Sequence, residues 1–107
     1  MFLSEKSKEM IRDYIPQGST VKDISDFFSV FADATRIKIL TALLISEMTV
    51  SDISSILDMH QSTISHQLKT LRAARMVETE RKGKIRMYGL AAGIDRVLEQ
   101  SFETFLK

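Results

Sequence analysis

The spacing of apolar residues changes along this chain of 107 residues, and that change constrains the fold more than any other feature. Up to Arg75 the apolar residues recur every three to four positions, which is the period of an α-helix. Two short β-prone runs follow, residues 76–81 and 85–90, and they flank a glycine that can adopt the positive φ of a hairpin turn. The helical period then resumes. The sequence therefore predicts a mainly α fold with one small β-hairpin (α+β).

The helical part divides into short segments. We expect helices over about residues 4–15, from Thr20 to Phe31, over 34–46, from about 50 to 57, over 61–74 and over 92–106. Thr49, with Asp52 three residues later, can cap the fourth of these helices. The fourth and fifth helices are joined by a tight turn, so residues 50–74 are predicted to form a helix-turn-helix within a single domain spanning residues 1–107. The aromatic residues Phe27, Phe28 and Phe31 are interpreted mainly as core.

The fifth helix has two contrasting faces. Ile64, Leu68 and Leu71 form an apolar stripe at positions i, i+4 and i+7. The opposite face and the helix start carry small or polar side chains, namely Gln61, Ser62, Thr63, Ser65, His66 and Lys69. Such side chains can enter a major groove, contact phosphates and reach base edges, whereas bulky ones would hold the helix away from the bases.

Positive charge is concentrated around this helix and the hairpin. The whole chain has a net charge of only +1, but residues 60–90 hold seven basic and two acidic side chains. A segregated basic block on a nearly neutral chain is typical of a protein that binds a polyanion. Besides the helix residues above, the candidate DNA-binding residues are Arg72, Lys82, Lys84 and Arg86, the last three in a hairpin (residues 76–90) that would contact the flanking backbone as a wing.

The last predicted helix carries an apolar stripe of its own. The stripe consists of Ile94, Val97, Leu98, Ser101, Phe102, Phe105 and Leu106. The candidate interface residues among them are Ile94, Val97, Leu98, Phe102 and Phe105. That stripe is too apolar for a helix at the edge of a small monomer, so we expect a second copy of the chain to cover it. The chain contains no cysteine, no stretch of signal-peptide length and no apolar run near the ~20 residues of a membrane span, which predicts a cytoplasmic protein without membrane contact.

No catalytic set is visible, so we do not expect an enzyme. Ser65, His66 and Asp58 cannot form a triad, because adjacent helical residues cannot pass a proton in line. The two histidines, His60 and His66, do not share a helix face and have no cysteine beside them, so no metal or other cofactor is predicted.

Three motifs in order resemble the ArsR/SmtB family of bacterial and archaeal winged-helix repressors, over roughly residues 24–90. Residues 31–40 (FADATRIKIL) are similar to the family signature LADPTRLKIL, with Ala34 in place of proline. Residues 61–72 (QSTISHQLKTLR) resemble its recognition helix QSTVSHHLKVLR, and residues 77–90 resemble its wing, including Gly83. The resemblance implies a winged helix-turn-helix fold.

The resemblance also implies a function. Members of the family are homodimers that bind an imperfect palindrome in duplex DNA and repress transcription until an inducer acts. The dimer is built from the first and last helices, here about residues 4–31 and 92–106, which adds Met10, Ile11 and Tyr14 to the expected interface.

The usual metal ligands of the family are replaced in this chain. Thr49 and Ser51 occupy the positions of one cysteine pair, and a hydroxyl is a poor substitute for a thiolate. Ala92, Ile94 and Phe105 stand at or near the ligand positions of the last helix. We therefore expect a repressor without the usual metal-sensing sites, whose inducer, if any, is an unidentified small molecule or protein.

Two alternatives remain open. One is a metal-responsive repressor with an unusual carboxylate site, for which the chain offers Asp23, Asp26, Asp95, Glu99 and Glu103. The other is a protein-interaction module that has kept the fold and lost DNA binding, which the polar helix face and the basic hairpin argue against.

Overall fold

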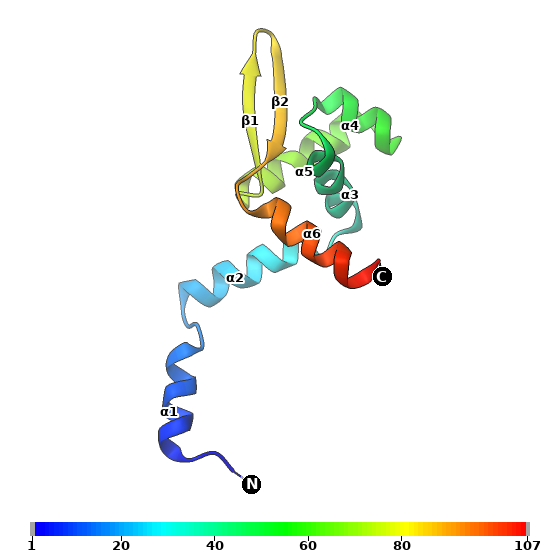
Figure 1. Ribbon diagram of the computed structural model, residues 1–107. Helices are drawn as coiled ribbons and strands as arrows, with labels where there is room; N and C mark the ends of the chain where they lie inside the picture. The colour runs from blue at the N-terminus through cyan, green and yellow to red at the C-terminus, as the bar shows by residue number, and fades with distance from the viewer. Residues whose placement is uncertain (1, 107) are drawn as a thin grey trace.

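The computed structural model describes residues 2–106, and these form the predicted elements in the predicted order (Figure 1). The fold class, mainly α with a two-stranded antiparallel hairpin, is confirmed. The elements are α1 (Glu5–Tyr14), α2 (Ser19–Val30), α3 (Ala34–Ile45), α4 (Val50–Leu57), α5 (Gln61–Ala73), β1 (Val77–Lys82), β2 (Ile85–Leu90) and α6 (Ile94–Phe105). No helix among the described residues is both long and apolar enough to cross a bilayer.

Helix α3 lies at the centre of a body made of α3, α4, α5, the hairpin and α6. Ile39 and Leu40 of α3 are fully buried, and Leu43 nearly so. They pack with side chains of α4, α5, β1 and α6 in one apolar cluster. This helix is central because it is apolar on more than one face and has to be covered on more than one side.

The helix-turn-helix forms as its caps predict. The Thr49 side chain accepts a hydrogen bond from the Asp52 amide at 3.1 Å, and the Asp52 carboxylate accepts one from the Thr49 amide at 3.1 Å. This capping box satisfies two amides at the start of α4. Helix α4 ends at Asp58, which adopts a left-handed conformation (φ +53°) that an aspartate tolerates better than most residues.

The hairpin pairs six residues of β1 with six of β2, from Val77 opposite Leu90 to Lys82 opposite Ile85. Its two-residue turn begins at Gly83 with φ +65°, which confirms the predicted role of that glycine. Strand β1 starts one residue later than predicted. The reason is that Met76 is fully buried and its backbone bonds to Leu71 and Ala91, so it closes the end of α5 before pairing begins.

The N-terminal helices α1 and α2, which we call the arm, differ from the body. Helix α1 contains no buried residue, and α2 contains only Val30, at its last position. Figure 1 shows the arm extending away from the body, which it joins through the end of α2. Gly18 (φ +61°) separates the two helices, and α2 begins at Ser19, one residue before the predicted start.

Candidate nucleic-acid interface

Helix α5 is oriented by its apolar stripe. Ile64, Leu68 and Leu71 are at most 1% exposed and pack in the core of the body. That packing directs the opposite face outward. The structure therefore brings the predicted helix residues to one exposed surface, made of Gln61, Ser62, Thr63, Ser65, His66 and Lys69. Arg72, in the last turn of α5, is also exposed.

The polar side chains of this surface have no hydrogen-bond or ion-pair partner among the described residues. Among residues 2–106, none of the polar side-chain atoms of Gln61, Ser62, Thr63, Ser65, His66 and Lys69 makes a hydrogen bond or ion pair with the protein. His60 stands at the N-cap position of α5 and forms no side-chain cap bond there. Hydrogen-bond donors at the start of α5 and along its exposed polar face, which we call the front of α5, are thus free for an external acceptor such as a phosphate.

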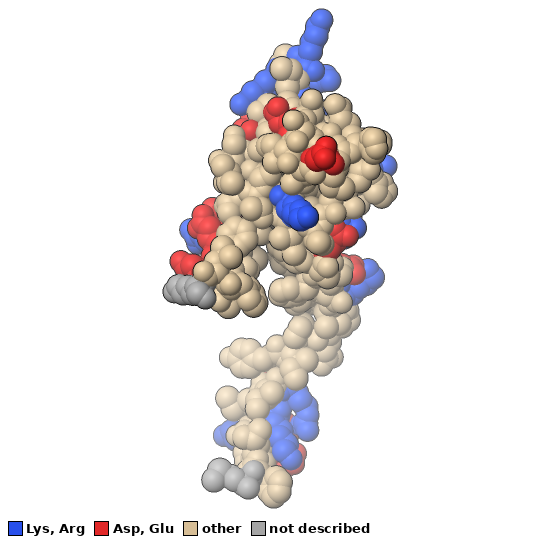
Figure 2. Space-filling model, turned by 90° about the vertical axis from the view of Figure 1, so that its right-hand side faces the viewer, with Lys and Arg blue, Asp and Glu red and all other residues tan. Residues whose placement is uncertain are grey.

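The basic side chains of the hairpin have different surroundings. Lys84, in the turn, makes no ion pair among the described residues, whereas Lys82 lies 3.8 Å from the Glu47 carboxylate. Arg86 donates across the hairpin to the Thr79 hydroxyl at 3.1 Å. All three side chains are exposed. Figure 2 shows Lys and Arg gathered at the end of the molecule where the hairpin tip projects, consistent with a cationic tip on a polar hairpin.

The hairpin is tied to the helix-turn-helix by residues that sequence reasoning missed. The backbone of Met48 exchanges two hydrogen bonds with that of Tyr88, at 3.1 and 2.9 Å, immediately before the capping box of α4. Gly89 permits the close approach of this segment, since a Cβ atom there would lie 3.2 Å from the Glu47 side chain. The wing therefore has a set position relative to α4, and no local sequence signal indicates the pairing.

Another missed contact joins α3 to α5. The Arg36 Nε donates to the Gln67 Oε1 at 2.8 Å. Arg36 lies within the family-like motif of residues 31–40, and no role was predicted for Gln67. Nothing in the sequence marks the two as partners, because they are 31 positions apart.

The predicted partner surface divides in two. Met10, Ile11 and Tyr14 on α1, and Val97 and Phe105 on α6, are exposed, and Phe102 is half-buried. Ile94 and Leu98, however, are 6% and 3% exposed and lie in the core of their own chain. The stripe on α6 is wide enough to cover α3 with one side and to leave the other side exposed, so the prediction that Ile94 and Leu98 contact a partner is wrong.

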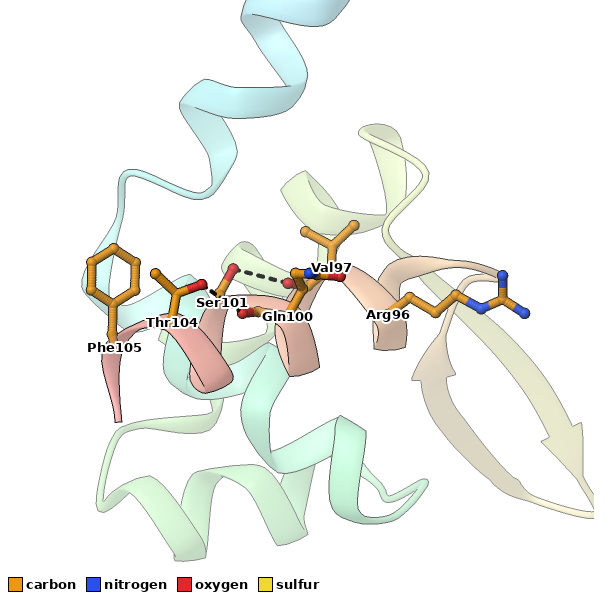
Figure 3. Close-up of a pocket in the computed structure, with 6 residues that line it drawn as sticks. All are labelled: Arg96, Val97, Gln100, Ser101, Thr104 and Phe105. Carbon is orange, nitrogen blue, oxygen red and sulfur yellow. Dashed lines mark hydrogen bonds between the residues drawn. The ribbon is translucent and has the colours of Figure 1, made fainter. Parts of the chain in front are cut away.

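The outer face of α6 is shown in Figure 3. Val97, Ser101, Thr104 and Phe105 line an open groove of about 380 Å³ that this helix forms alone. Apolar residues of α2 are bare as well, since Phe28 is 64% exposed, Val21 46% and Ile24 42%. The interpretation of Phe28 as core is therefore wrong. Phe27 and Phe31, in contrast, pack against the core.

Carboxylates and histidines do not gather into a metal site within residues 2–106, where no group of three or more potential ligands is found. Asp26 instead pairs with Lys22 at 2.7 Å on the surface of α2. A single chain thus offers no support for the alternative of a carboxylate metal site.

A model of the arsR family of bacterial regulatory proteins matches residues 33–79. The chain is also 34% identical over 67 residues to the transcriptional repressor SdpR of Bacillus subtilis, covering 74% of that protein and 63% of this chain. The chain belongs to the arsR family. It is 33% identical over 86 residues to a transcriptional repressor SmtB homolog of Synechocystis, covering 65% of that protein and 78% of this chain.

The fold of this arsR-family chain recurs in solved structures. The homodimeric winged helix-turn-helix DNA-binding domain Mb0332 of Mycobacterium bovis superposes with a TM-score of 0.76 at 23% identity, over 80% of this chain and 81% of that one. This likeness confirms the winged helix-turn-helix fold. The chain spans 56 to 65% of the length of the first curated relatives that it matches.

Proposed function

We propose that two copies of this chain bind duplex DNA together and repress transcription, with α5 in the major groove and the hairpin against the flanking backbone. The observation that carries the proposal is the front of α5, where six small or polar side chains are exposed and make no hydrogen bond or ion pair among residues 2–106, while the opposite face of the helix is buried in the core. The relatives in Synechocystis and Bacillus subtilis are transcriptional repressors, which supports the same function.

Each residue has a proposed role. Gln61, Ser62, Ser65 and His66 face the base edges, and Thr63 and Lys69 contact the groove walls and phosphates. Arg72, Lys82, Lys84 and Arg86 add attraction to the backbone that does not depend on sequence. No residue set for catalysis enters this proposal, and the regulatory signal is left to an inducer of unspecified chemistry.

The second copy is proposed from the bare apolar residues. A partner would cover Met10, Ile11 and Tyr14 of α1 and Val97, Phe102 and Phe105 of α6, together with Phe28 of α2. Exposed apolar residues spread over three helices in a chain this small favour an interface. Two identical subunits related by a two-fold axis would present two copies of α5 to a palindromic site. The homodimeric Mb0332 domain supports this arrangement.

The test is selection of bound duplexes from genomic fragments, followed by fluorescence anisotropy on a selected duplex and a scrambled one. The selected duplex should bind more tightly, with log affinity falling linearly as log salt rises. Gln61→Ala and Ser62→Ala should change which sequence is preferred, whereas Lys69→Ala should weaken both duplexes alike. A flat salt response and no selected sequence would refute the proposal and favour the protein-interaction module.

A further inference from the structure

One side-chain hydrogen bond connects α5, the helix with the exposed polar face, to the central helix α3. It joins Arg36, in the first turn of α3, to Gln67, in the middle of α5, with an Nε to Oε1 distance of 2.8 Å. Among residues 2–106 it is the only side-chain to side-chain hydrogen bond between two helices. Both residues are half-buried, so the bond is shielded in part from competing water.

The two ends of this bond are held in place by their own elements. Arg36 follows the N-cap Asp33, whose carboxylate accepts a hydrogen bond from the Arg36 amide at 3.0 Å. Gln67 directly precedes Leu68, which is 1% exposed in the core. The bond therefore connects two anchored points rather than two mobile surface chains.

The apolar stripe decides which face of α5 points outward, but it restrains the fine rotation of the helix less sharply than a directional bond does. Burial of Ile64, Leu68 and Leu71 is non-directional and tolerates small rotations about the helix axis. A hydrogen bond weakens steeply once its donor–hydrogen–acceptor angle falls below about 120°, so the bond to Gln67 adds a directional restraint on the rotation of α5. Ser65 and His66 directly precede Gln67, and their direction depends on the same rotation.

We propose that Arg36 is a positioning residue for base recognition, because its bond to Gln67 fixes the rotation of α5 in the groove. The inference rests on the proposed function. Without the bond, phosphate attraction persists, since it tolerates small rotations. Hydrogen bonds to base edges lose their alignment, so the preference for one sequence declines.

The positioning role of Arg36 can be tested without unfolding the protein, because of the surroundings of its side chain. Its side chain borders an open cavity of about 620 Å³ between α2 and the end of α5, lined also by Phe27, Thr70 and Arg75. Water can enter there and solvate a guanidinium that has lost Gln67. Variants at either position should therefore remain folded.

The experiment measures the ratio of affinities for a selected and a scrambled duplex, for wild type, Gln67→Met, Gln67→Glu, Arg36→Ala and the double variant Arg36→Ala/Gln67→Met. Lys38→Ala is the matched control, because it removes an exposed charge from the same helix without touching the bond. Gln67→Met and Arg36→Ala should each lower the ratio about tenfold, and the double variant no further. Gln67→Glu keeps an acceptor for Arg36 and should retain the ratio.

Two results would overturn the positioning role. One is an unchanged ratio in Gln67→Met. The other is an equal loss on both duplexes that follows a lower free energy of unfolding, which is the signature of a merely structural bond. Wild type is measured first, because a wild type without preference between the duplexes refutes the proposed function, and the positioning role with it.

Discussion

The body and the arm of this chain differ in how far they bury their own apolar side chains. In the body, α3 to α6 and the hairpin enclose a shared cluster in which seven large side chains are less than 2% exposed. In the arm, α1 buries nothing and α2 buries one residue. The radius of gyration is 18.1 Å, against about 13 Å for a compact domain of this length, and the excess reflects the projecting arm (Figure 1).

The contrast indicates which surfaces need a partner. The body has its own core and presents the front of α5 on a rigid scaffold. The arm has amphipathic helices with bare apolar sides, which cost free energy in water unless another surface covers them. The proposed second copy is therefore needed by the arm and by the outer side of α6, whereas the DNA-facing geometry belongs to the rest of the body.

The largest expected effect is a loss of stability of the body. Leu68→Ala removes a side chain that is 1% exposed, and loss of its packing should lower the free energy of unfolding by about 3 kcal/mol. Urea denaturation followed by circular dichroism measures it at fixed protein concentration. A loss below about 1 kcal/mol would show that α5 is not anchored by this stripe.

The next largest effect is a weaker proposed dimer, caused by a substitution in the arm. Phe28→Ser should leave the fold of the body intact and raise the dissociation constant of the proposed dimer about 30-fold, because an exposed aromatic anchor is lost. Sedimentation velocity over a concentration series measures it. Ile56→Ser is the matched control, since Ile56 is 61% exposed on α4 and Phe28 is 64% exposed on α2. Equal effects of the two substitutions would contradict the division into body and arm.

A smaller effect tests the start of the helix-turn-helix. Thr49→Ala removes the acceptor of the Asp52 amide and should cost about 1 kcal/mol of unfolding free energy. Thr49→Ser retains the hydroxyl and should restore most of it. If the alanine and serine variants are equally stable by thermal denaturation, the capping box contributes nothing to the body.

The smallest effect on stability comes from the wing. Lys84→Ala should change the unfolding free energy by less than about 0.5 kcal/mol. It should nevertheless reduce the slope of log affinity against log salt by about two, one for each copy in a dimer. Lys22→Ala, on the arm and paired with Asp26, should leave the slope unchanged. A slope that responds to both substitutions alike would remove the special role of the wing.

Most of the local structure was predictable from the sequence, and particular residues show why. The capping box at Thr49, the turn at Gly83 and the period of Ile64, Leu68 and Leu71 are short-range features, and the structure confirms each. Element ends were less predictable. Helix α6 begins at Ile94 and not at residue 92, because Gly93 adopts φ +89° just before it.

The residues of the candidate site were predictable from the sequence, but the contacts that hold α5 and the hairpin in place were not. The exposed front of α5 follows from helical periodicity alone. The bonds from Met48 to Tyr88 and from Arg36 to Gln67 join residues far apart in the chain. Such contacts depend on the packing angles of whole elements, which no local pattern specifies.

Local patterns in the sequence specify which segments are helices and strands and which face of each helix is apolar, because spacing, caps and turn residues act over a few positions. Which apolar faces the chain covers with its own residues follows from the arrangement of the elements in three dimensions. Leu98 is buried and its neighbour Val97 is 39% exposed, although both belong to one stripe. The physical reason is that burial depends on what packs against a face, and that is settled by the arrangement of all the elements together.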